Sequence, residues 1–480
     1  MRRSPFLAPL ALAGAVGSAS AASLPSPSCK YLPGDPGWPS ADAWAQLNRT
    51  VDGRLVATVP YAVDASGPAD VQAALRFADQ HNVRLVVRNT GHDYNGRSTG
   101  AGALAVWTHH LKGAEIIDWD DGSYYVGKAL RAGAGVQGFE AIAAADAAGL
   151  AVVTGECPTV GIAGGRHADR DLVTASRTQN EDLYWALSGG GGGNYGVVTS
   201  ITTKAHPDAP VSGATFAVTI PEGDNNETLY RVIDAFHAAL PDIVDAGVMI
   251  IYFFGPGFLQ SPALTAYNKT RADVERILAP LVGSLAQLNV TLEPTYTSFD
   301  TYRGHYNHYW GPLPSGNIQV GTQLFGGRLL PRAVLPSFGP TARRLVELGV
   351  TYIGVGLDVS RFGRDGANAV LPQWRDSIVQ VSLTLPWSFE APFADMLAEQ
   401  DRMTEVVQPV IEAATPGAGA YINEADFQQK DWQETFFGAN YPRLLRVKNK
   451  YDPAGLLYNV AAVGSDAWNV DYHGRMCRRS

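Results

Sequence analysis

Two short stretches of the sequence combine glycine with a side chain that can act as a nucleophile. The stretch from Arg88 to Gly100 reads RNTGHDYNGRSTG and contains His92, whereas the stretch from Gly155 to Gly165 reads GECPTVGIAGG and contains Cys157. A neutral imidazole and a thiolate are both available near neutral pH. Each loop therefore offers one group that could bond to a ligand, although either residue alone would also fit an ordinary surface histidine or a small buried cysteine.

Both loops follow segments that favour β-strands. Val83 to Val87 is a β-branched run of the kind found in buried strands, and Ala151 to Thr154 precedes the second loop in the same way. Because a glycine-rich turn after a strand can expose several backbone N–H groups in succession, it can form a concave nest for phosphate oxygens. We therefore expect the first loop to hold a phosphate-containing ligand.

A third glycine-rich stretch argues against the commonest nucleotide-binding motifs. In the segment EDLYWALSGGGGGNYGVVTSITTK, a predicted helix precedes Gly189 to Gly193, and a predicted strand, Val197 to Thr203, follows them. Dinucleotide and P-loop sites need the opposite order, with phosphate at the N-terminus of the following helix. The glycines instead permit close approach of the backbone to a flat ligand or to a neighbouring strand.

The C-terminal part contains polar residues in a regular pattern. Those between Tyr421 and Asp426 alternate with apolar residues, which predicts a half-buried strand. If these polar side chains are buried, they must bond a ligand or each other, because burying them unpaired is costly. If they are exposed, they form a solvated face of the strand. Both interpretations stay open on this pattern alone. A helix with basic residues along it, Tyr441 to Lys450, is predicted to follow.

The composition bounds the size and class of the protein. The chain has 480 residues, 46% hydrophobic and 17% charged, so it can bury a large core and predicts two domains. Its net charge is −9 and it has no basic run of five or more residues, which argues against a nucleic-acid partner. Strands and helices alternate in the first half, and strand-like runs with amphipathic helices follow Pro207. This pattern predicts an α+β protein.

The N-terminus predicts secretion. Arg2 and Arg3 precede an apolar segment, Phe6 to Val16, which is typical of a signal peptide, here residues 1–21. A membrane anchor would need about 20 apolar residues, so no membrane attachment is expected. Sequons for N-glycosylation occur at Asn48, Asn226, Asn268 and Asn289.

The chain contains three cysteines. Cys29 and Cys477 lie near opposite ends of the sequence, where they could form a disulfide or stay apart. Cys157 would then be the odd cysteine of a secreted chain, either as a small buried residue or as a group committed to another bond.

Three separated segments together resemble a known family. VVRNTGHDYNGRSTG, GECPTVGIAGG and YINEADFQQKDWQETFFGANYPRLLRVKNKYDP are similar to motifs of the berberine-bridge-enzyme-like flavoproteins of the vanillyl-alcohol-oxidase superfamily, especially secreted fungal members. The resemblance implies a two-lobed PCMH-type FAD-binding domain plus a substrate domain of antiparallel sheet backed by helices. The expected boundaries are a signal peptide (1–21), an N-terminal lead-in (22–50), the FAD-binding domain (51–207), the substrate-binding domain (208–415), a C-terminal segment returning to the FAD domain (416–463) and a tail (464–480).

The resemblance also implies a cofactor and the residues that hold it. In this family the histidine of the first motif bonds the C8-methyl carbon of the flavin and the cysteine of the second bonds its C6 carbon, so His92 and Cys157 are expected to attach FAD bicovalently. Tyr421 is expected to help deprotonate a substrate hydroxyl while hydride passes to the flavin. No metal site is expected. The other expected cofactor-binding residues are Arg88, Asn89, Thr90, Gly91, Asp93, Gly96, Ser98, Gly161, Gly165, Asn423 and Asn459.

The implied activity is removal of hydride from an alcohol-type carbon of a secondary metabolite or carbohydrate. A monomeric enzyme is expected, with dioxygen reoxidising the flavin to give hydrogen peroxide. One feature departs from the family pattern: after Gly165 a glycine-rich loop and strands usually follow, whereas this chain continues RHADRDLVTASRTQNEDLYWAL. The FAD domain is thus expected to be shortened near residues 165–171. The alternative expectation is a flavin-poor or inactive relative that acts at most as a binding protein.

Overall fold

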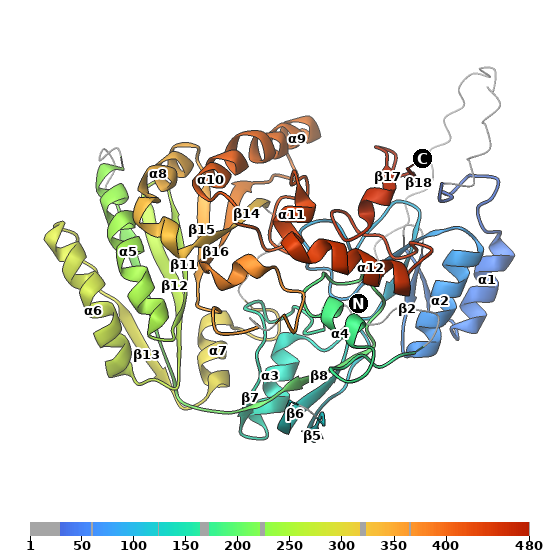
Figure 1. Ribbon diagram of the computed structural model, residues 1–480, viewed down its shortest axis with the longest axis horizontal. Coiled ribbons are helices and arrows are strands. Elements are labelled where there is room, and N and C mark those ends of the chain that lie inside the picture. The colour runs from blue at the N-terminus through green and yellow to red at the C-terminus, as the bar shows by residue number, and fades with distance from the viewer. Residues whose placement is uncertain are drawn as a thin grey trace, which may run out of the picture.

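The computed structural model of the protein describes residues 29–58, 61–122, 124–163, 172–220, 226–316, 323–363 and 366–479. The predicted signal peptide at residues 1–21, Gly165 and the junction that follows it lie outside these residues. Figure 1 shows a large sheet with its helices on one side of the molecule and two smaller sheets on the other. This arrangement confirms the predicted α+β class with two domains.

The N-terminal part is built on two small sheets. The first has the order β1-β2-β4-β3, in which β2, β4 and β3 run parallel and β1 is antiparallel to β2. The second is antiparallel with the order β5-β6-β8, and β7 pairs with β9. These strands are β1 Leu55–Ala57, β2 Tyr61–Asp64, β3 Arg84–Arg88, β4 Ala103–Trp107, β5 Ala114–Asp120, β6 Val126–Gly133, β7 Leu150–Ala151, β8 Ser200–Lys204 and β9 His206–Pro207.

Four helices belong to this part of the chain: α1 Ala41–Thr50, α2 Pro68–Gln80, α3 Gly138–Asp146 and α4 Glu181–Leu187. Helix α2 starts with a proline at its first turn, where the missing N–H costs nothing. Trp44 and Leu47 of α1 pack in one apolar cluster with α2. Part of the segment predicted as a lead-in is therefore a helix in the core of the N-terminal domain.

The domain expected to bind substrate is a seven-stranded antiparallel sheet of order β13-β10-β12-β11-β15-β16-β14. Its main core packs α5, α6, α8 and α10 against one face, whereas α7 packs with Ile142 of α3 against residues of the other face. Figure 1 shows α7 between the large sheet and the N-terminal domain. The bounds are β10 Val211–Thr219, β11 Met249–Gly255, β12 Phe258–Tyr267, β13 Thr295–Phe299, β14 Gln323–Pro331, β15 Thr351–Gly356, β16 Ser377–Pro386, α5 Glu227–Asp245, α6 Arg271–Gln287, α7 Tyr302–Trp310, α8 Gly339–Glu347, α9 Phe393–Arg402 and α10 Gln408–Ala414.

The C-terminal segment returns to the N-terminal domain, where α4 shares an apolar cluster with α11 Trp432–Phe437 and α12 Tyr441–Tyr451 (Figure 1). A hairpin follows, β17 Trp468–Val470 paired with β18 Met476–Arg478. None of the described helices is both long and apolar enough to cross a bilayer. The shorter turns of helix are 3-10 helices at Arg332–Ser337, Pro372–Arg375, Gly438–Asn440 and Ser465–Ala467, and a π-helix at Met403–Val407.

The two ends of the described chain are joined. Cys29 and Cys477 form a disulfide across a sequence separation of 448 residues, which resolves the alternative that the sequence left open. The guanidinium of Arg475 also donates to both carboxylate oxygens of Asp35, at 2.8 and 2.9 Å. The segment predicted as a tail is therefore fixed to the start of the N-terminal domain.

Replacing Cys29 by Ser is expected to lower the melting temperature, because the disulfide restricts an unfolded chain over nearly its whole length. Loss of such a bond typically costs about 2–5 kcal/mol. The measurement is a thermal melt together with a titration of free thiols under denaturing conditions. Cys477→Ser should give the same melting temperature as Cys29→Ser, and each variant should show one free thiol more than wild type. A thiol count that falls by one in the variant would show that the two cysteines are not bonded, because Cys29 would then have been a free thiol in the wild type.

Candidate active site

The His92 loop presents a row of backbone donors. It connects β3 to β4, and the N–H groups from Thr90 to Gly96 have no acceptor among the residues that the structure describes. Gly91 and Gly96 have φ angles of 82° and 70°, the left-handed conformation that such a turn requires. Successive free N–H groups in a turn form a concave site for an anion. The geometry therefore suits the phosphates of a nucleotide cofactor.

The side chain of Asp93 stabilises this loop through hydrogen bonds to backbone N–H groups of the loop itself. Its carboxylate accepts hydrogen bonds from the backbone N–H groups of Arg97, at 2.5 Å, and Ser98, at 2.9 Å. The N–H of Ser98 is thus already used by the protein. Arg88 is exposed at the end of β3, with its guanidinium beside Gly91, where an added Cβ would lie 3.0 Å from Nη2.

Buried polar atoms without partners surround the loop. The amide nitrogen of Asn95 donates to the carbonyl of Ile422 at 2.7 Å, and Nε of Arg97 donates to the carbonyl of Val460 at 3.2 Å. Yet Oδ1 of Asn89, Oδ1 of Asn95 and Nη2 of Arg97 are buried with no partner among the described residues. Because an unpaired buried polar atom costs free energy, a polar ligand in this place would stabilise all three. The residues present therefore fit a bound FAD.

The Cys157 loop is held from both domains. Tyr306 of α7 donates to the carbonyls of the two residues before Cys157, at 2.6 Å for Glu156 and 3.1 Å for its neighbour. From the N-terminal domain, Nε2 of Gln137 donates to the carbonyl of Thr159 at 2.6 Å. The position of the thiol is thus set by contacts on both sides of the loop.

His92 and Cys157 meet at one hydroxyl. Oγ1 of Thr159 lies 2.8 Å from Nε2 of His92 and 3.4 Å from Sγ of Cys157, and Nδ1 of His92 lies 2.8 Å from Oγ1 of Thr90. Burial raises the pKa of the Cys157 thiol, but hydrogen bonds from His92 and Thr159 outweigh it and lower the pKa to about 7. The structure thus brings together the two residues that the resemblance selects for attachment, and their contacts favour the thiolate form of Cys157.

The glycine run approaches other backbone closely. Gly189 has a φ of 129°, and an added Cβ would lie 2.1 Å from the backbone nitrogen of Val370. Asn459 binds the same run by donating from Nδ2 to the carbonyl of Gly193 at 3.1 Å. Gly161 of the Cys157 loop likewise contacts Asn89, whose amide atoms would lie 3.1 Å from an added Cβ. Because they lack a side chain, these glycines allow segments that are distant in sequence to pack closely against one another.

The predicted strand from Tyr421 to Asp426 is wrong. The segment is a series of turns, in which the backbone N–H of Glu424 donates to the carbonyl of Tyr421 at 2.9 Å. The fully buried carboxylate of Asp426 accepts from Thr404 at 2.6 Å and from Gln400 at 2.9 Å. The alternation of polar and apolar residues thus reflects anchoring to the helices at residues 393–414 and not a sheet edge.

Tyr421 lies in a cavity of about 250 Å³ beside the glycine run. Its hydroxyl accepts from Nδ2 of Asn423 at 2.9 Å, and its ring meets that of Trp374 edge-on at 5.7 Å. Burial, together with the carboxylate of Glu424, raises the pKa of Tyr421 in spite of the hydrogen bond from Asn423. The neighbours therefore keep this phenol protonated. The cavity is lined among others by Leu187, Gly191, Trp374, Tyr421, Ile422 and Phe436.

Two carboxyl groups share this region: Glu424, which belongs to the polar pattern noted in the sequence, and Glu156, which the sequence did not single out. Glu424 accepts from the hydroxyl of Ser382 at 3.0 Å, and burial raises its pKa. Burial also raises the pKa of Glu156 to about 8, with contributions from Glu424 and Cys157. Their positions in the sequence are the feature that could have identified them, because Glu156 directly precedes Cys157 and Glu424 lies in the same segment as Tyr421. Thr159 was missed because its hydroxyl contacts a histidine far away in the sequence.

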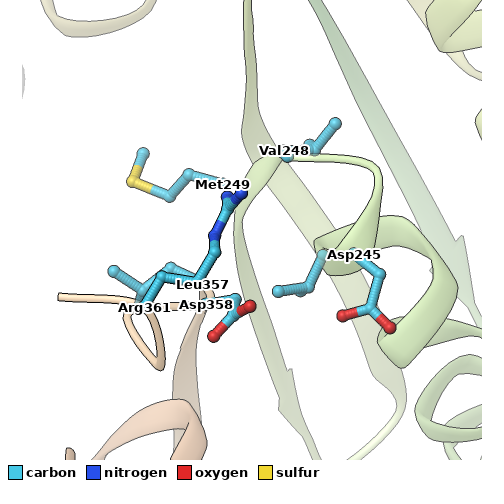
Figure 2. Close-up of a pocket in the computed structure, with 8 residues that line it drawn as sticks. Asp245, Val248, Met249, Leu357, Asp358 and Arg361 are labelled. Atoms are coloured by element: carbon cyan, nitrogen blue, oxygen red, sulfur yellow. The ribbon is translucent and has the colours of Figure 1, made fainter. Parts of the chain in front are cut away.

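A larger cleft, of about 470 Å³, lies elsewhere in the substrate domain. Figure 2 shows it between the end of α5, the start of β11 and the segment after β15, with Asp245, Asp358 and Arg361 around it. No residue of the three motifs is among those that line it. Tyr421 and Asn423 line the smaller cavity instead.

Comparison with known proteins matches the site to two family profiles. "FAD binding domain" matches residues 60–166, and "Berberine and berberine like" matches residues 420–464. FAD-linked oxidoreductase ZEB1 of Gibberella zeae is 42% identical over 95% of this chain and 96% of that protein. The VAO-type flavoprotein MtVAO615 of Myceliophthora thermophila C1 superimposes with a TM-score of 0.88 at 34% identity, covering 94% of this chain and 100% of that one. Xylooligosaccharide oxidase from the same fungus, at 21% identity and a TM-score of 0.65 over 88% and 95% of the two chains, shares the fold.

The relatives are longer within the aligned region. The alignment with ZEB1 spans 543 positions, whereas this chain has 480 residues, so at least 63 positions have no counterpart here. The FAD-domain match ends at residue 166, next to the place where the sequence departs from the family pattern.

Glu156→Gln is expected to change how stability depends on pH. The folded protein holds this carboxyl at a pKa of about 8, whereas an unfolded glutamate has a pKa of about 4.3. The stability that the protonated group contributes is therefore present below about pH 4.3 and is lost as pH rises to about 8. Between about pH 5 and about pH 8 the variant should gain melting temperature relative to wild type.

The matched control is Glu115→Gln, on the exposed side of β5, where the carboxylate pairs with Arg131 at 3.1 Å. Its difference from wild type should not vary over this pH range. Melting curves of Glu156→Gln that run parallel to those of wild type would contradict the raised pKa.

Proposed function

The chain belongs to the berberine-bridge-enzyme-like FAD-linked oxidoreductases of the vanillyl-alcohol-oxidase superfamily, and from this membership we propose that it removes hydride from an alcohol-type carbon. The observation that carries the proposal is the meeting of the donor loop, the His92–Cys157 pair and the Tyr421 cavity in one region. Bound FAD would supply the hydride acceptor. The remaining steps fall to side chains of this chain.

The cofactor is proposed to be held bicovalently. His92 would attach to the C8-methyl carbon and Cys157 to the C6 carbon of the flavin. The shared contact with Thr159 supports this, because both nucleophiles lie within hydrogen-bond reach of the same hydroxyl. The row of free N–H groups from Thr90 to Gly96 would bind the pyrophosphate, and Asn459 would hold the glycine run against the cofactor.

Tyr421 would bind the substrate hydroxyl and take its proton. Because its neighbours raise its pKa, the phenol must pass its own proton on as it accepts another. Glu424 supplies a carboxyl group whose charge reaches Tyr421, and Ser382 holds that carboxyl in place at 3.0 Å. We propose Glu424 as the acceptor of this proton and Asn423 as the residue that orients the phenol oxygen.

The substrate is proposed to be a secondary metabolite, with a carbohydrate as the alternative. Leu187, Ile422 and Phe436 give the cavity a largely apolar lining beside Tyr421, which suits a hydrophobic molecule better than a sugar.

Reoxidation by dioxygen with release of hydrogen peroxide would suit secretion, because no nicotinamide supply is needed outside the cell. Asn268 and Asn289 are exposed, and Asn48 and Asn226 half-buried, so we propose the first two as the better acceptors of glycans on a secreted monomer.

A second candidate function rests on chain length. If the at least 63 positions missing relative to ZEB1 include elements that cover the flavin, the protein would bind FAD poorly and act at most as a binding protein. The visible spectrum of the purified protein distinguishes the two candidates.

The wild-type protein is expected to be yellow, and the colour should stay with the polypeptide after denaturation and filtration. His92→Ala should keep part of the flavin through Cys157, whereas combining His92→Ala with Cys157→Ala should release all of it. His110→Ala is the matched control, since this exposed histidine pairs with Asp64 at 2.7 Å, and it should retain flavin as wild type does. Flavin that resists extraction from the double variant would refute the assignment, and a colourless wild type would favour the second candidate.

Tyr421→Phe is expected to slow reduction of the flavin by substrate about 100-fold or more, the usual contribution of a positioned acid–base group, without changing flavin attachment. Stopped-flow absorbance with a panel of aromatic and aliphatic alcohols and oligosaccharides measures the rate and identifies the substrate class. Tyr472→Phe is the control, since this tyrosine is 91% exposed. Equal reduction rates for Tyr421→Phe and wild type would remove Tyr421 from the mechanism.

A further inference from the structure

We propose that Thr159 is a positioning residue that joins His92 to Cys157 and carries a proton between them. The inference rests on the proposed attachment of FAD at these two residues, and it assigns a role to a hydroxyl that neither bonds the flavin nor contacts the substrate in that scheme.

The geometry places one hydroxyl between the two nucleophiles. Oγ1 of Thr159 lies 2.8 Å from Nε2 of His92 and 3.4 Å from Sγ of Cys157. A hydroxyl has one donor and two acceptor positions, so it can donate to the imidazole while it accepts from the thiol. The 3.4 Å contact is within the range for sulfur, whose hydrogen bonds are longer than those of oxygen.

The other side of the imidazole selects the tautomer that this scheme needs. Nδ1 of His92 lies 2.8 Å from Oγ1 of Thr90. If Nδ1 carries the proton and donates it to Thr90, Nε2 is left as the acceptor for Thr159. Both ring nitrogens then have partners, and the ring is held in one orientation.

The backbone fixes Thr159 in this place. Its carbonyl accepts from Nε2 of Gln137 at 2.6 Å, and the N–H of Val160 donates to the carbonyl of Cys157 at 3.2 Å, which closes a tight turn. The hydroxyl of Thr159 therefore lies on the side of the turn where the thiol and the imidazole lie. Its side chain loses little conformational freedom when the hydroxyl bridges these two groups.

The proton balance follows from these contacts. Sγ–H of Cys157 gives its proton to Oγ1 of Thr159 while the hydroxyl of Thr159 gives its own proton to Nε2 of His92. The thiol becomes a thiolate, the imidazole becomes an imidazolium, and Thr159 is unchanged. No electron is transferred and no further reactant is needed, and the charges produced lie beside each other.

The titratable groups around the thiol permit this separation of charge. Glu156, Tyr94 and Tyr306 all lie close enough for their charges to interact with that of Cys157. Burial raises the pKa of each of them, so that near neutral pH all three are held in their neutral forms. No neighbouring negative charge in this group therefore opposes a thiolate, which hydrogen bonds from His92 and Thr159 stabilise.

The test uses the reactivity of Cys157, which is the free cysteine of the chain because the other two form the disulfide. The full chain, produced in riboflavin-deficient medium so that the thiol is free, is alkylated with iodoacetamide at a series of pH values. Wild type should show half-maximal rate near pH 7, the pKa of this thiol. Thr159→Val should move the midpoint towards the ordinary value of about 8.5 and slow alkylation at neutral pH roughly tenfold.

Thr159→Ser keeps the hydroxyl and is the matched control, so its profile should follow that of wild type. His92→Ala should shift the profile as Thr159→Val does, because the proton then has no acceptor. A Thr159→Val profile that coincides with wild type, or a Thr159→Ser profile that coincides with Thr159→Val, would overturn the proposal.

A second readout ties the proposal to the cofactor. In protein produced with riboflavin, Thr159→Val should lower the fraction of flavin attached at Cys157, measured by mass spectrometry of the cysteine peptide, and Thr159→Ser should restore it. If wild type carries no flavin but keeps the shifted thiol profile, the proposed function fails and the role of Thr159 stands. If wild type carries flavin and Thr159→Val attaches it at Cys157 as completely as wild type, the role of Thr159 fails.

Discussion

The ammonium group of Lys448 is buried between three parts of the chain that must meet for the site to exist. It donates to the carbonyl of Asn194 at 2.6 Å, to the carboxylate of Asp452 at 2.6 Å and to the carbonyl of Leu457 at 2.5 Å. Burial lowers the pKa of Lys448, although Asp452 acts in the opposite direction. A buried charge is tolerated only when its hydrogen bonds are satisfied, so helix α12, the end of the glycine run and the segment that carries Asn459 are held in one arrangement.

The same constraint explains why the site lies where the two domains meet. The N-terminal domain provides the loops with His92 and Cys157, but Tyr306 comes from the substrate domain and Ile422 from the C-terminal segment. Tyr306 donates to backbone carbonyls of the Cys157 loop, whereas the backbone carbonyl of Ile422 accepts from the side-chain amide of Asn95 in the His92 loop. The loops keep their shape because segments remote in sequence satisfy their backbone groups, so a shift of either domain would disturb the nucleophiles directly.

The sequence predicted the elements whose evidence is local, and it failed where the evidence is tertiary. The strand before His92 and the turn after it follow from β-branched residues and glycines, and the structure has β3 at Arg84–Arg88 followed by that turn. The segment after Tyr421 was mistaken for a strand because Asp426 is anchored by Gln400 and Thr404, which no local pattern reveals. The same holds for Thr159, whose hydroxyl reaches a histidine 67 positions away.

Burial acts on every acidic group of this site, yet it does not act on them equally. It raises the pKa values of Glu156, Glu424 and Tyr421 because each charged form would lose hydration. For Cys157 the pKa moves in the opposite direction, since hydrogen bonds from His92 and Thr159 favour the thiolate more than burial disfavours it. Raised pKa values of the oxygen acids beside a lowered pKa of one thiol favour attack by the sulfur of Cys157. This selectivity is what the proposed covalent attachment of the cofactor at Cys157 requires.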